Sequence, residues 1–317
     1  MALYLTEQDV EELLTMDMAL EAVTAAHAAH AAGRAVDVPR QRTRIPTAAL
    51  HILQGALLDE GVFGYKAYTT SRTGARFLVH LFDAATGSLL AVIEADRLGM
   101  MRTGATGGLA AQWLANKDAE VAGVFGAGWQ AQSQIEALAR VRQLRRVKVF
   151  SRNEEKRLAF CDRLSQSTGV EVVSAASAEE TVRGSAVVVT ITSATTPLFD
   201  GAWLEPGTHV TAAGSNALIR REIDEKAVQR AACVCVDSRA TALREAGDLL
   251  PALEKGRLAE GQMVELGEVI AGTRPGRRTA EEITLFESQG MAIQDLAVAK
   301  RLLALARERG AGRDLPF

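Results

Sequence analysis

Short apolar runs alternate with amphipathic stretches through the middle of the chain. Runs of strand length lie at residues 120–125, 147–150, 171–173, 186–192, 209–213 and 233–237. Helical patterns lie between the earlier runs, at residues 103–115, 130–142, 153–168 and 178–183. This regular alternation of strand and helix predicts parallel βαβ units.

The first hundred residues follow a different pattern. An alanine-rich stretch at residues 22–35 predicts a helix, because Gly33 lies near its end and small residues permit close packing. Apolar runs of strand length follow at residues 50–53, 62–68, 77–82 and 89–94. Turns with Gly or Asp separate the later runs, so a helix followed by a β-meander is expected. Near the C-terminus, a strand-like run at residues 284–286 precedes a last helix at residues 294–305.

The composition is that of an ordinary globular protein. Of the 317 residues, 48% are hydrophobic and 24% are charged, and the formal net charge is −3. Such a charge gives no reason to expect nucleic acid or an anionic membrane as a partner. The N-terminal residues are acidic and unlike a signal peptide, and no apolar run reaches the roughly 20 residues of a membrane span. We therefore expect a cytoplasmic protein.

The cysteines and histidines do not predict a metal site. Cys161, Cys233 and Cys235 form no CxxC pair, and their odd number favours a reducing compartment. Cys233 and Cys235 alternate in an apolar run, so buried thiols are expected rather than a metal pair. The five histidines show no HExxH or comparable spacing.

The strongest local motif is a glycine-rich turn between an apolar strand and a helix. Its sequence is Gly126-Ala127-Gly128-Trp129-Gln130-Ala131. In a dinucleotide-binding fold, Gly126 makes the tight turn, Gly128 lets the backbone approach a pyrophosphate, and Ala131 permits close packing of the helix. The pyrophosphate would bind at the N-terminus of the helix, where free N–H groups favour negative charge. The alternative is a glycine turn in an α/β protein that binds no nucleotide.

The end of the second strand of this motif indicates which dinucleotide binds. NAD sites usually carry Asp or Glu there, which accepts hydrogen bonds from the adenosine ribose. This chain has Ser151 at that position, followed by Arg152. A hydroxyl and a guanidinium would hold a 2′-phosphate that a carboxylate would repel. We therefore expect NADPH rather than NADH, unless Arg152 is only a solvated surface charge.

Two familiar arrangements for carbonyl reduction are absent from the sequence. Tyr4, Tyr65 and Tyr68 are the tyrosines, and none has a lysine four residues later. His209 is the histidine downstream of the glycine turn, and its apolar run favours a core position. An imine is an easier substrate, because its nitrogen is protonated or nearly so before hydride attacks.

Several blocks along essentially the whole chain resemble the ornithine cyclodeaminase/μ-crystallin family, which also contains archaeal-type alanine dehydrogenases and ketimine reductases. Besides the glycine turn, these blocks are Gly64-Tyr65-Lys66, Met101-Arg102-Thr103-Gly104-Ala105, Pro206-Gly207-Thr208-His209, Glu265-Leu266-Gly267-Glu268-Val269-Ile270 and Ser288-Gln289-Gly290-Met291-Ala292-Ile293-Gln294-Asp295. Their order and spacing match the family pattern.

The resemblance implies an α/β fold of two domains and a homodimer. A Rossmann-type NADP-binding domain would cover residues 115–289. An α+β domain for substrate binding and dimerisation, built on an antiparallel sheet, would combine residues 1–114 with 290–317. The active site is expected in the cleft. Further cofactor contacts are expected at Arg102, Thr103, Thr192, Ser288 and Gly290.

The resemblance also implies a clamp for the substrate carboxylate, formed by Arg42, Lys66 and Arg102. Arg40 and Arg44 flank Arg42, so the sequence leaves open which of the three arginines binds. Arg102 begins a predicted helix, where guanidinium and N–H groups both favour an anion. Lys66 lies in an apolar run, where a buried lysine without a partner is costly. Alternatively, Lys66 lies at a surface edge and Arg102 is an ordinary charge on a helix.

One residue departs from the pattern of the amino-acid-oxidising members. Those members carry an aspartate in the loop after the strand at residues 209–213, and here Asn216 occupies the position. Asparagine cannot act as a base, but it can orient an imine nitrogen. We therefore expect NADPH-dependent reduction of the C=N bond of a small, cyclic 2-imino acid, with Lys66 and Asn216 as catalytic residues. The alternatives are an ornithine cyclodeaminase or alanine dehydrogenase activity, and a non-catalytic ligand-binding protein.

Overall fold

The computed structural model describes residues 1–316 and divides into two compact units. The first unit comprises Met1–Arg102 with Gly290–Phe317, and the second comprises Thr103–Gln289. Each contains its own sheet, and the second has the parallel βαβ architecture of a Rossmann domain, which confirms the expected α/β fold class.

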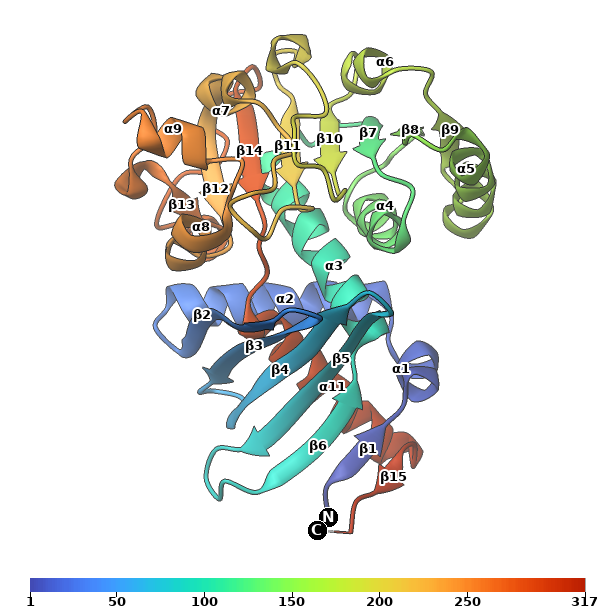
Figure 1. Ribbon diagram of the computed structural model, residues 1–317, viewed down its shortest axis with the longest axis vertical. Helices are drawn as coiled ribbons and strands as arrows, with labels where there is room; N and C mark the ends of the chain where they lie inside the picture. Colours follow the sequence, from blue (N-terminus) through green and yellow to red (C-terminus); the bar gives the residue numbers. More distant parts are fainter. Residues whose placement is uncertain (317) are drawn as a thin grey trace. The chain divides into compact units, whose positions relative to one another are not determined.

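The first sheet has the strand order β15-β1-β6-β5-β4-β3-β2 (Figure 1). Its strands are β1 (Leu3–Leu5), β2 (Ala35–Ile45), β3 (Ala48–Leu57), β4 (Val62–Ser71), β5 (Gly74–Asp83), β6 (Leu89–Glu94) and β15 (Arg313–Asp314). Strands β3 to β6 form the expected antiparallel meander, and β2, which the sequence did not predict, extends it at the edge. Three helices belong to this unit: α1 (Glu7–Leu13), α2 (Met16–Ala31) and α11 (Ala292–Arg309).

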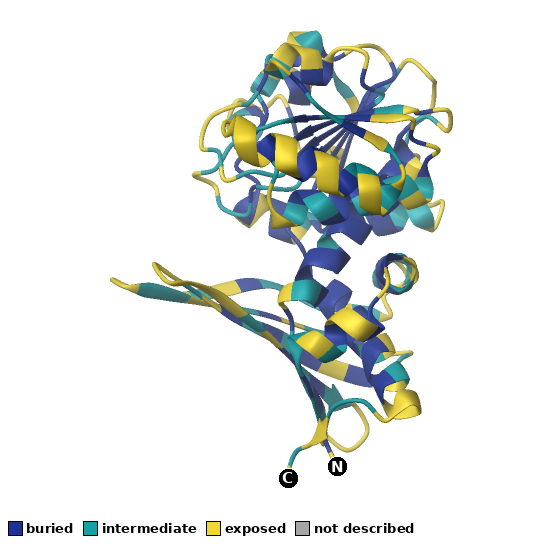
Figure 2. Ribbon diagram, turned by 90° about the vertical axis from the view of Figure 1, so that its right-hand side faces the viewer, coloured by how far each residue is buried: buried dark blue, intermediate teal, exposed yellow. Residues whose placement is uncertain are grey.

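One face of this sheet packs on α11. Along β4, Val62, Gly64, Lys66 and Tyr68 are buried, and the residues between them are more exposed. This period of two is that of a strand with one covered face. A Cβ on Gly64 would lie 3.1 Å from Leu296 of α11, so glycine here permits a close approach. Figure 2 shows α2 and α11 on the same side of the sheet.

The second sheet has the order β13-β12-β14-β11-β10-β7-β8-β9, and its strands are parallel. They are β7 (Val121–Phe125), β8 (Arg146–Phe150), β9 (Glu171–Ser174), β10 (Val187–Thr190), β11 (His209–Ala212), β12 (Ala231–Val236), β13 (Val264–Glu265) and β14 (Ile283–Glu287). Strands β10, β11 and β14 are buried along their whole length, as expected for a parallel sheet covered on both faces. The chain order reverses between β7 and β10, where Rossmann domains bind their ligand.

Helices of the second unit connect these strands. They are α4 (Trp129–Val141), α5 (Glu154–Thr168), α6 (Ala178–Val182), α7 (Glu225–Arg230), α8 (Arg239–Glu245), α9 (Leu250–Glu254) and α10 (Leu266–Ile270), with short 3-10 turns at Gly201–Trp203 and Glu260–Gln262. The free thiols of Cys161, Cys233 and Cys235 are buried in this unit, and burial was expected for Cys233 and Cys235. Across residues 1–316, no helix is both long and apolar enough to cross a membrane.

Helix α3 (Asp96–Leu114) contains the boundary between the units. The sequence suggested a boundary after residue 114, but the second unit begins at Thr103. Gly104 and Gly108 explain the difference, because they bring this part of α3 against α4. A Cβ on Gly104 would lie 2.4 Å from the backbone of Ser133, and a Cβ on Gly108 would lie 2.8 Å from Ala137. Close packing on α4 therefore assigns this part of α3 to the second unit.

Candidate active site

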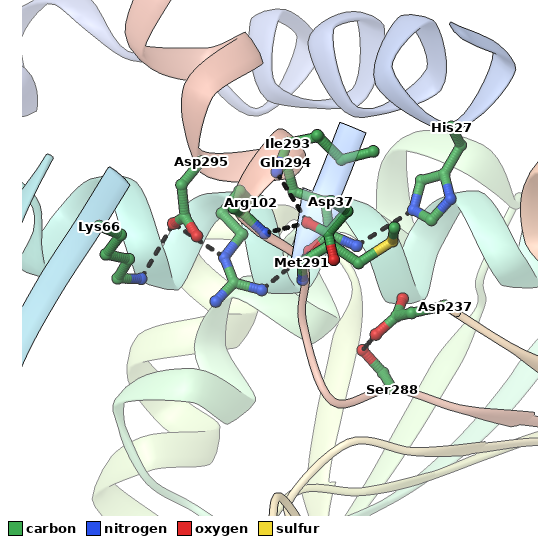
Figure 3. A network of polar contacts seen from close by, with 11 residues as sticks. His27, Asp37, Lys66, Arg102, Asp237, Ser288, Met291, Ile293, Gln294 and Asp295 are labelled. Carbon is green, nitrogen blue, oxygen red and sulfur yellow. Dashed lines mark hydrogen bonds and ion pairs between the residues drawn. The ribbon is translucent and has the colours of Figure 1, made fainter. Parts of the chain in front are cut away.

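Lys66 and Arg102 converge on one buried carboxylate in the first unit (Figure 3). Lys66 Nζ donates to Asp295 Oδ1 at 2.9 Å, and Arg102 Nε donates to the same oxygen at 3.1 Å. All three side chains are buried, Asp295 completely. Lys66 and Arg102 thus bring an ammonium and a guanidinium together in a buried site, and such groups suit an anionic ligand such as a carboxylate.

The N-terminal turn of α11 fixes the Arg102 guanidinium. Gln294 Oε1 accepts from Arg102 Nη1 at 2.9 Å and from the Met291 N–H at 3.2 Å. Gly290 has a φ of +82°, and a Cβ there would lie 2.5 Å from Arg102 Nη1. The Ala292 N–H donates to Asp37 of β2 at 2.7 Å, so a strand side chain caps this helix. These contacts hold Arg102 in one orientation.

The surroundings of Lys66 tune its charge. Burial lowers the pKa of Lys66 to about 8, although the adjacent Asp295 carboxylate raises it. The ammonium also lies over the ring of Phe77, 5.1 Å from its centroid. Gly99 of α3 permits this position, since a Cβ there would lie 2.8 Å from Lys66 Nζ. Burial therefore favours release of the Lys66 proton, and the Asp295 carboxylate opposes it.

The three arginines of β2 differ in burial. Arg40 is buried, with 7% of its surface exposed, whereas Arg42 is only half-buried and Arg44 is exposed. The Arg40 charge is among the main influences that lower the pKa of Lys66. Arg42 pairs in the sheet with His51, and burial together with the three arginine charges lowers the pKa of His51 to about 4.

The glycine-rich turn connects β7 to α4 in the second unit. Gly126 has a φ of +120°, and a Cβ there would lie 2.7 Å from the Ile191 carbonyl oxygen, so the fold itself requires this glycine. A Cβ on Gly128 would meet no atom of the described chain within 4 Å. The fold therefore does not require glycine at residue 128, whereas the close approach of a pyrophosphate would.

Helix α4 offers further groups that fit a dinucleotide. Its N-cap is Gly128, which provides no side-chain hydrogen bond, while α5 is capped by Asn153 and α6 by Ser177. The N–H groups of the first turn of α4 therefore favour an anion. Gln130 Oε1 is buried without a hydrogen-bond partner in residues 1–316. Ala127 precedes this turn, and Ala131 is completely buried where α4 packs on the sheet.

Ser151 and Arg152 follow β8, which pairs with β7. Ser151 is half-buried and Arg152 is exposed. Arg157 of α5, which we did not single out from the sequence, donates to the Ser151 carbonyl and to Ser174 Oγ. It also lies over the ring of Phe150. Arg157 therefore fixes the end of β8 and adds positive charge near Ser151.

One buried carboxylate joins the loops after β10 and β11. Glu222 accepts from the N–H groups of Thr192 at 2.6 Å and Gly214 at 2.7 Å, and from Thr190 Oγ1 at 3.0 Å. Burial raises the pKa of Glu222 to about 7 despite the bonds from Thr192 and Gly214. Asn216 lies half-buried in the second of these loops. Thr192 and Asn216 are thus carried by loops with a common anchor.

More carboxyl groups gather at the ends of β12 and β14. Ser288 Oγ and the Gln289 N–H donate to Asp237 Oδ2, at 3.1 and 2.8 Å (Figure 3). Burial raises the pKa of Glu287 well above its usual range, and the charge of Asp248 raises it further. Burial and the neighbouring carboxyl groups therefore favour the neutral form of Glu287.

The expected site residues divide between the units. Arg42, Lys66, Arg102 and Gly290 belong to the first, and Arg102 and Gly290 meet there. The second contains Thr103, Gly126, Ala127, Gly128, Gln130, Ala131, Ser151, Arg152, Thr192, Asn216 and Ser288. Sequence reasoning assigned no role to Asp295 or Glu222, although both lay in segments singled out for other reasons. A buried acid beside a predicted lysine was the signal that could have identified Asp295.

Comparison with known proteins decides the family. The family model described as "Ornithine cyclodeaminase/mu-crystallin family" matches residues 2–309. The chain belongs to this family. A Δ1-pyrroline-2-carboxylate reductase of Bacillus cereus is 38% identical over 241 residues, which cover 76% of this chain and 74% of that protein.

Two solved structures are closely similar to this chain over nearly its whole length. The Δ1-pyrroline-2-carboxylate reductase of Thermococcus litoralis, in complex with NADH and L-proline, is 31% identical, with a TM-score of 0.94 and coverage of 99% of this chain and 100% of that one. An archaeal alanine dehydrogenase dimer with bound NAD is 34% identical, with a TM-score of 0.94 and coverage of 100% and 99%. These relatives are NAD(P)-dependent oxidoreductases that act on imines or amino acids, and this chain is an enzyme of the same kind.

Proposed function

We propose that the protein reduces the C=N bond of a small, cyclic 2-imino acid with NADPH, as in Δ1-pyrroline-2-carboxylate or Δ1-piperideine-2-carboxylate. The observation that carries this proposal is the buried group of Lys66, Arg102 and Asp295. Its ammonium and guanidinium groups suit a substrate carboxylate, and Lys66 can donate a proton to a nitrogen next to the carboxylate-bearing carbon. The similarity to two reductases of Δ1-pyrroline-2-carboxylate supports the same chemistry.

We propose Arg40, rather than Arg42, as the arginine of β2 that contacts the carboxylate. Arg40 is buried and its charge acts on Lys66, whereas Arg42 lies beside His51 and is more exposed. Arg102 and Arg40 would bind the carboxylate oxygens, and Lys66 would face the imine nitrogen. Arg40→Ala should therefore raise the KM of the imino acid more than Arg42→Ala does.

The dinucleotide supplies hydride when bound, and the residues of the second unit fit it. Gly128 and the uncapped start of α4 suit the pyrophosphate, and Ser151 and Arg152 suit a 2′-phosphate. The two related structures contain NADH and NAD, so the preference for NADPH rests on Ser151, Arg152 and Arg157 of this chain. Thr192, Thr103 and Ser288 would line the same site.

Asn216 favours reduction over amino-acid oxidation. Oxidation requires a base that takes a proton from the substrate ammonium, and an amide cannot serve. An amide can still orient the imine nitrogen. The similarity to alanine dehydrogenase keeps amino-acid oxidation as the second candidate function.

We also propose a homodimer, formed through the outer face of the first sheet. This face carries Phe63, Tyr65, Leu78, His80 and Phe82 in cross-strand pairs, and the rings of Tyr65 and His80 stack at 4.6 Å. Phe63 and Leu78 are exposed in the single chain. Exposed apolar side chains gathered on one face favour association with a second copy.

The test is a steady-state panel of cyclic imino acids, open-chain imines, ornithine and alanine with both dinucleotides. We expect turnover of a cyclic 2-imino acid with NADPH preferred over NADH. Ammonia release from ornithine would contradict the proposed reaction. Tight NADPH binding without turnover of any imine would instead indicate a binding protein.

A further inference from the structure

Asp295 is the acidic group that acts on Lys66. The charged groups with the largest influence on Lys66 are Asp295 of α11, Arg102 of α3 and Arg40 of β2, and the Phe77 ring of β5 lies beside it. Two of these groups are cations, which favour loss of the Lys66 proton. Asp295 opposes them by direct contact at 2.9 Å.

The position of Asp295 is fixed by the backbone. It lies in the first turn of α11, whose initial N–H groups donate to Asp37 of β2. Its Oδ1 also binds Arg102 Nε, so a shift of Asp295 would move both cations. Figure 3 shows Asp295 directed at Lys66 and Arg102 together.

We propose that Asp295 is a positioning residue for the reduction, which keeps Lys66 as an ammonium group and directs it toward the substrate nitrogen. This inference rests on the proposed imine reduction. In that reaction the carbon of the C=N bond receives hydride as NADPH is oxidised to NADP⁺. The nitrogen receives a proton from Lys66 Nζ, which is left as a neutral amine and regains a proton from solvent. Charge and atoms balance without a further reactant.

The consequence is a specific dependence on pH. Without the Asp295 charge, Lys66 faces two arginines and should lose its proton at lower pH. The alkaline limit of kcat/KM should then move in the same direction, because the proton donor is lost earlier. A role of Asp295 in packing alone would lower stability and leave this limit unchanged.

The experiment compares wild type with Asp295→Asn and Asp295→Glu. The titration of Lys66 is followed by NMR in ¹³C-lysine-labelled protein without ligand, with Lys66→Met to assign the resonance. The pH profile of kcat/KM is measured with Δ1-pyrroline-2-carboxylate and NADPH. Glu60→Gln is the matched control. It removes a carboxylate that pairs with Arg301, which lies further along α11 than Asp295.

In Asp295→Asn, we expect the midpoints of the NMR titration and of the alkaline limb to fall by about 1 unit or more. Glu60→Gln should leave both unchanged. An unchanged Lys66 titration in folded Asp295→Asn overturns the inference. If Asp295→Asn does not fold, Asp295→Glu tests the inference instead. A normal Lys66 titration together with a kcat at least roughly tenfold lower supports a positioning role. An unchanged kcat in Asp295→Glu contradicts that role.

The proposed function is tested separately. A lack of activity of the wild-type protein on every imine tested would contradict the proposed reaction, whatever the NMR titration shows. If the wild type is active but the Lys66 titration and the pH profile of kcat/KM are unshifted in Asp295→Asn, only the proposed role of Asp295 is contradicted.

Discussion

Glu222 accepts a hydrogen bond from the Gly214 N–H at 2.7 Å, which closes the loop after β11 on itself. A Cβ on Gly214 would lie 2.5 Å from the same carboxylate, so this contact requires glycine. The Thr192 N–H donates to the other oxygen at 2.6 Å. The loop that carries Asn216 therefore begins and ends at one buried side chain, which also fixes the loop after β10.

Replacing Glu222 with Gln should change how stability depends on pH. Burial raises the pKa of Glu222 to about 7 from its ordinary value of 4.5, so the folded protein holds this proton more tightly than the unfolded chain. The stabilisation that the folded protein gains from holding this proton is complete below the ordinary pKa of 4.5. It is lost as the pH rises through the folded-state pKa of about 7. The shift corresponds to on the order of 3 kcal/mol. Relative to Glu222→Gln, wild type should therefore lose free energy of unfolding as the pH rises from about 5 to about 8.

Urea denaturation at each pH measures this difference. Glu171→Gln is a suitable control, because Glu171 is exposed on the same sheet and pairs with Arg146 at the surface. It should leave the slope against pH nearly unchanged over this range. A constant difference between wild type and Glu222→Gln would show that Glu222 does not titrate there.

The two glycines of the turn should respond differently to alanine. Gly128→Ala should fold with an unchanged melting temperature, because its Cβ meets nothing in the chain, but its Kd for NADPH should rise about tenfold or more. Gly126→Ala should lower the free energy of unfolding by roughly 1–3 kcal/mol through backbone strain. The clash of its Cβ with the Ile191 carbonyl oxygen should lower it further. Thermal melting and fluorescence titration with NADPH measure both effects. Equal loss of stability in the two variants would contradict the distinction.

The dinucleotide preference should depend on Arg152. Arg152→Ala removes a guanidinium that would bind the 2′-phosphate, so kcat/KM with NADPH should fall about 10- to 100-fold, while the value with NADH changes little. Ser151→Asp should shift the preference further toward NADH, because its carboxylate repels a phosphate and accepts from ribose hydroxyls. Arg163→Ala, an exposed substitution on α5, is the control. Parallel losses with both dinucleotides would argue against a phosphate contact.

Local patterns of the sequence predicted much of the second unit. The glycine turn and the strands around it follow from short-range apolar periodicity, and their burial on both faces agrees with it. Strand β2 was missed, because Pro39 and three arginines interrupt the apolar alternation. The choice between Arg40 and Arg42 was also open, since the register of β2 against β3 shifts between Val38 and Gln41. No local pattern reports such a bulge.

The partners of the candidate site residues could not be predicted in the same way. Lys66 and Asp295 are 229 positions apart, and their contact exists only because α11 packs on β4. The sequence could suggest that a buried lysine needs an acid, but several acids were available. Long-range packing, rather than propensity, selects the partner.

The outer face of the first sheet provides the last prediction. Phe63 and Leu78 lie on this face with 40% and 36% of their surfaces exposed, and the Phe63 ring stacks on Phe82. Phe63→Glu combined with Leu78→Glu would bring two carboxylates into an apolar interface, which is costly, so light scattering should show a monomer where wild type is a dimer. Leu58→Glu, at an exposed position in the turn after β3, should remain dimeric. A dimeric double variant with unchanged circular dichroism would exclude this face as the interface, and a monomeric wild type would exclude the dimer itself.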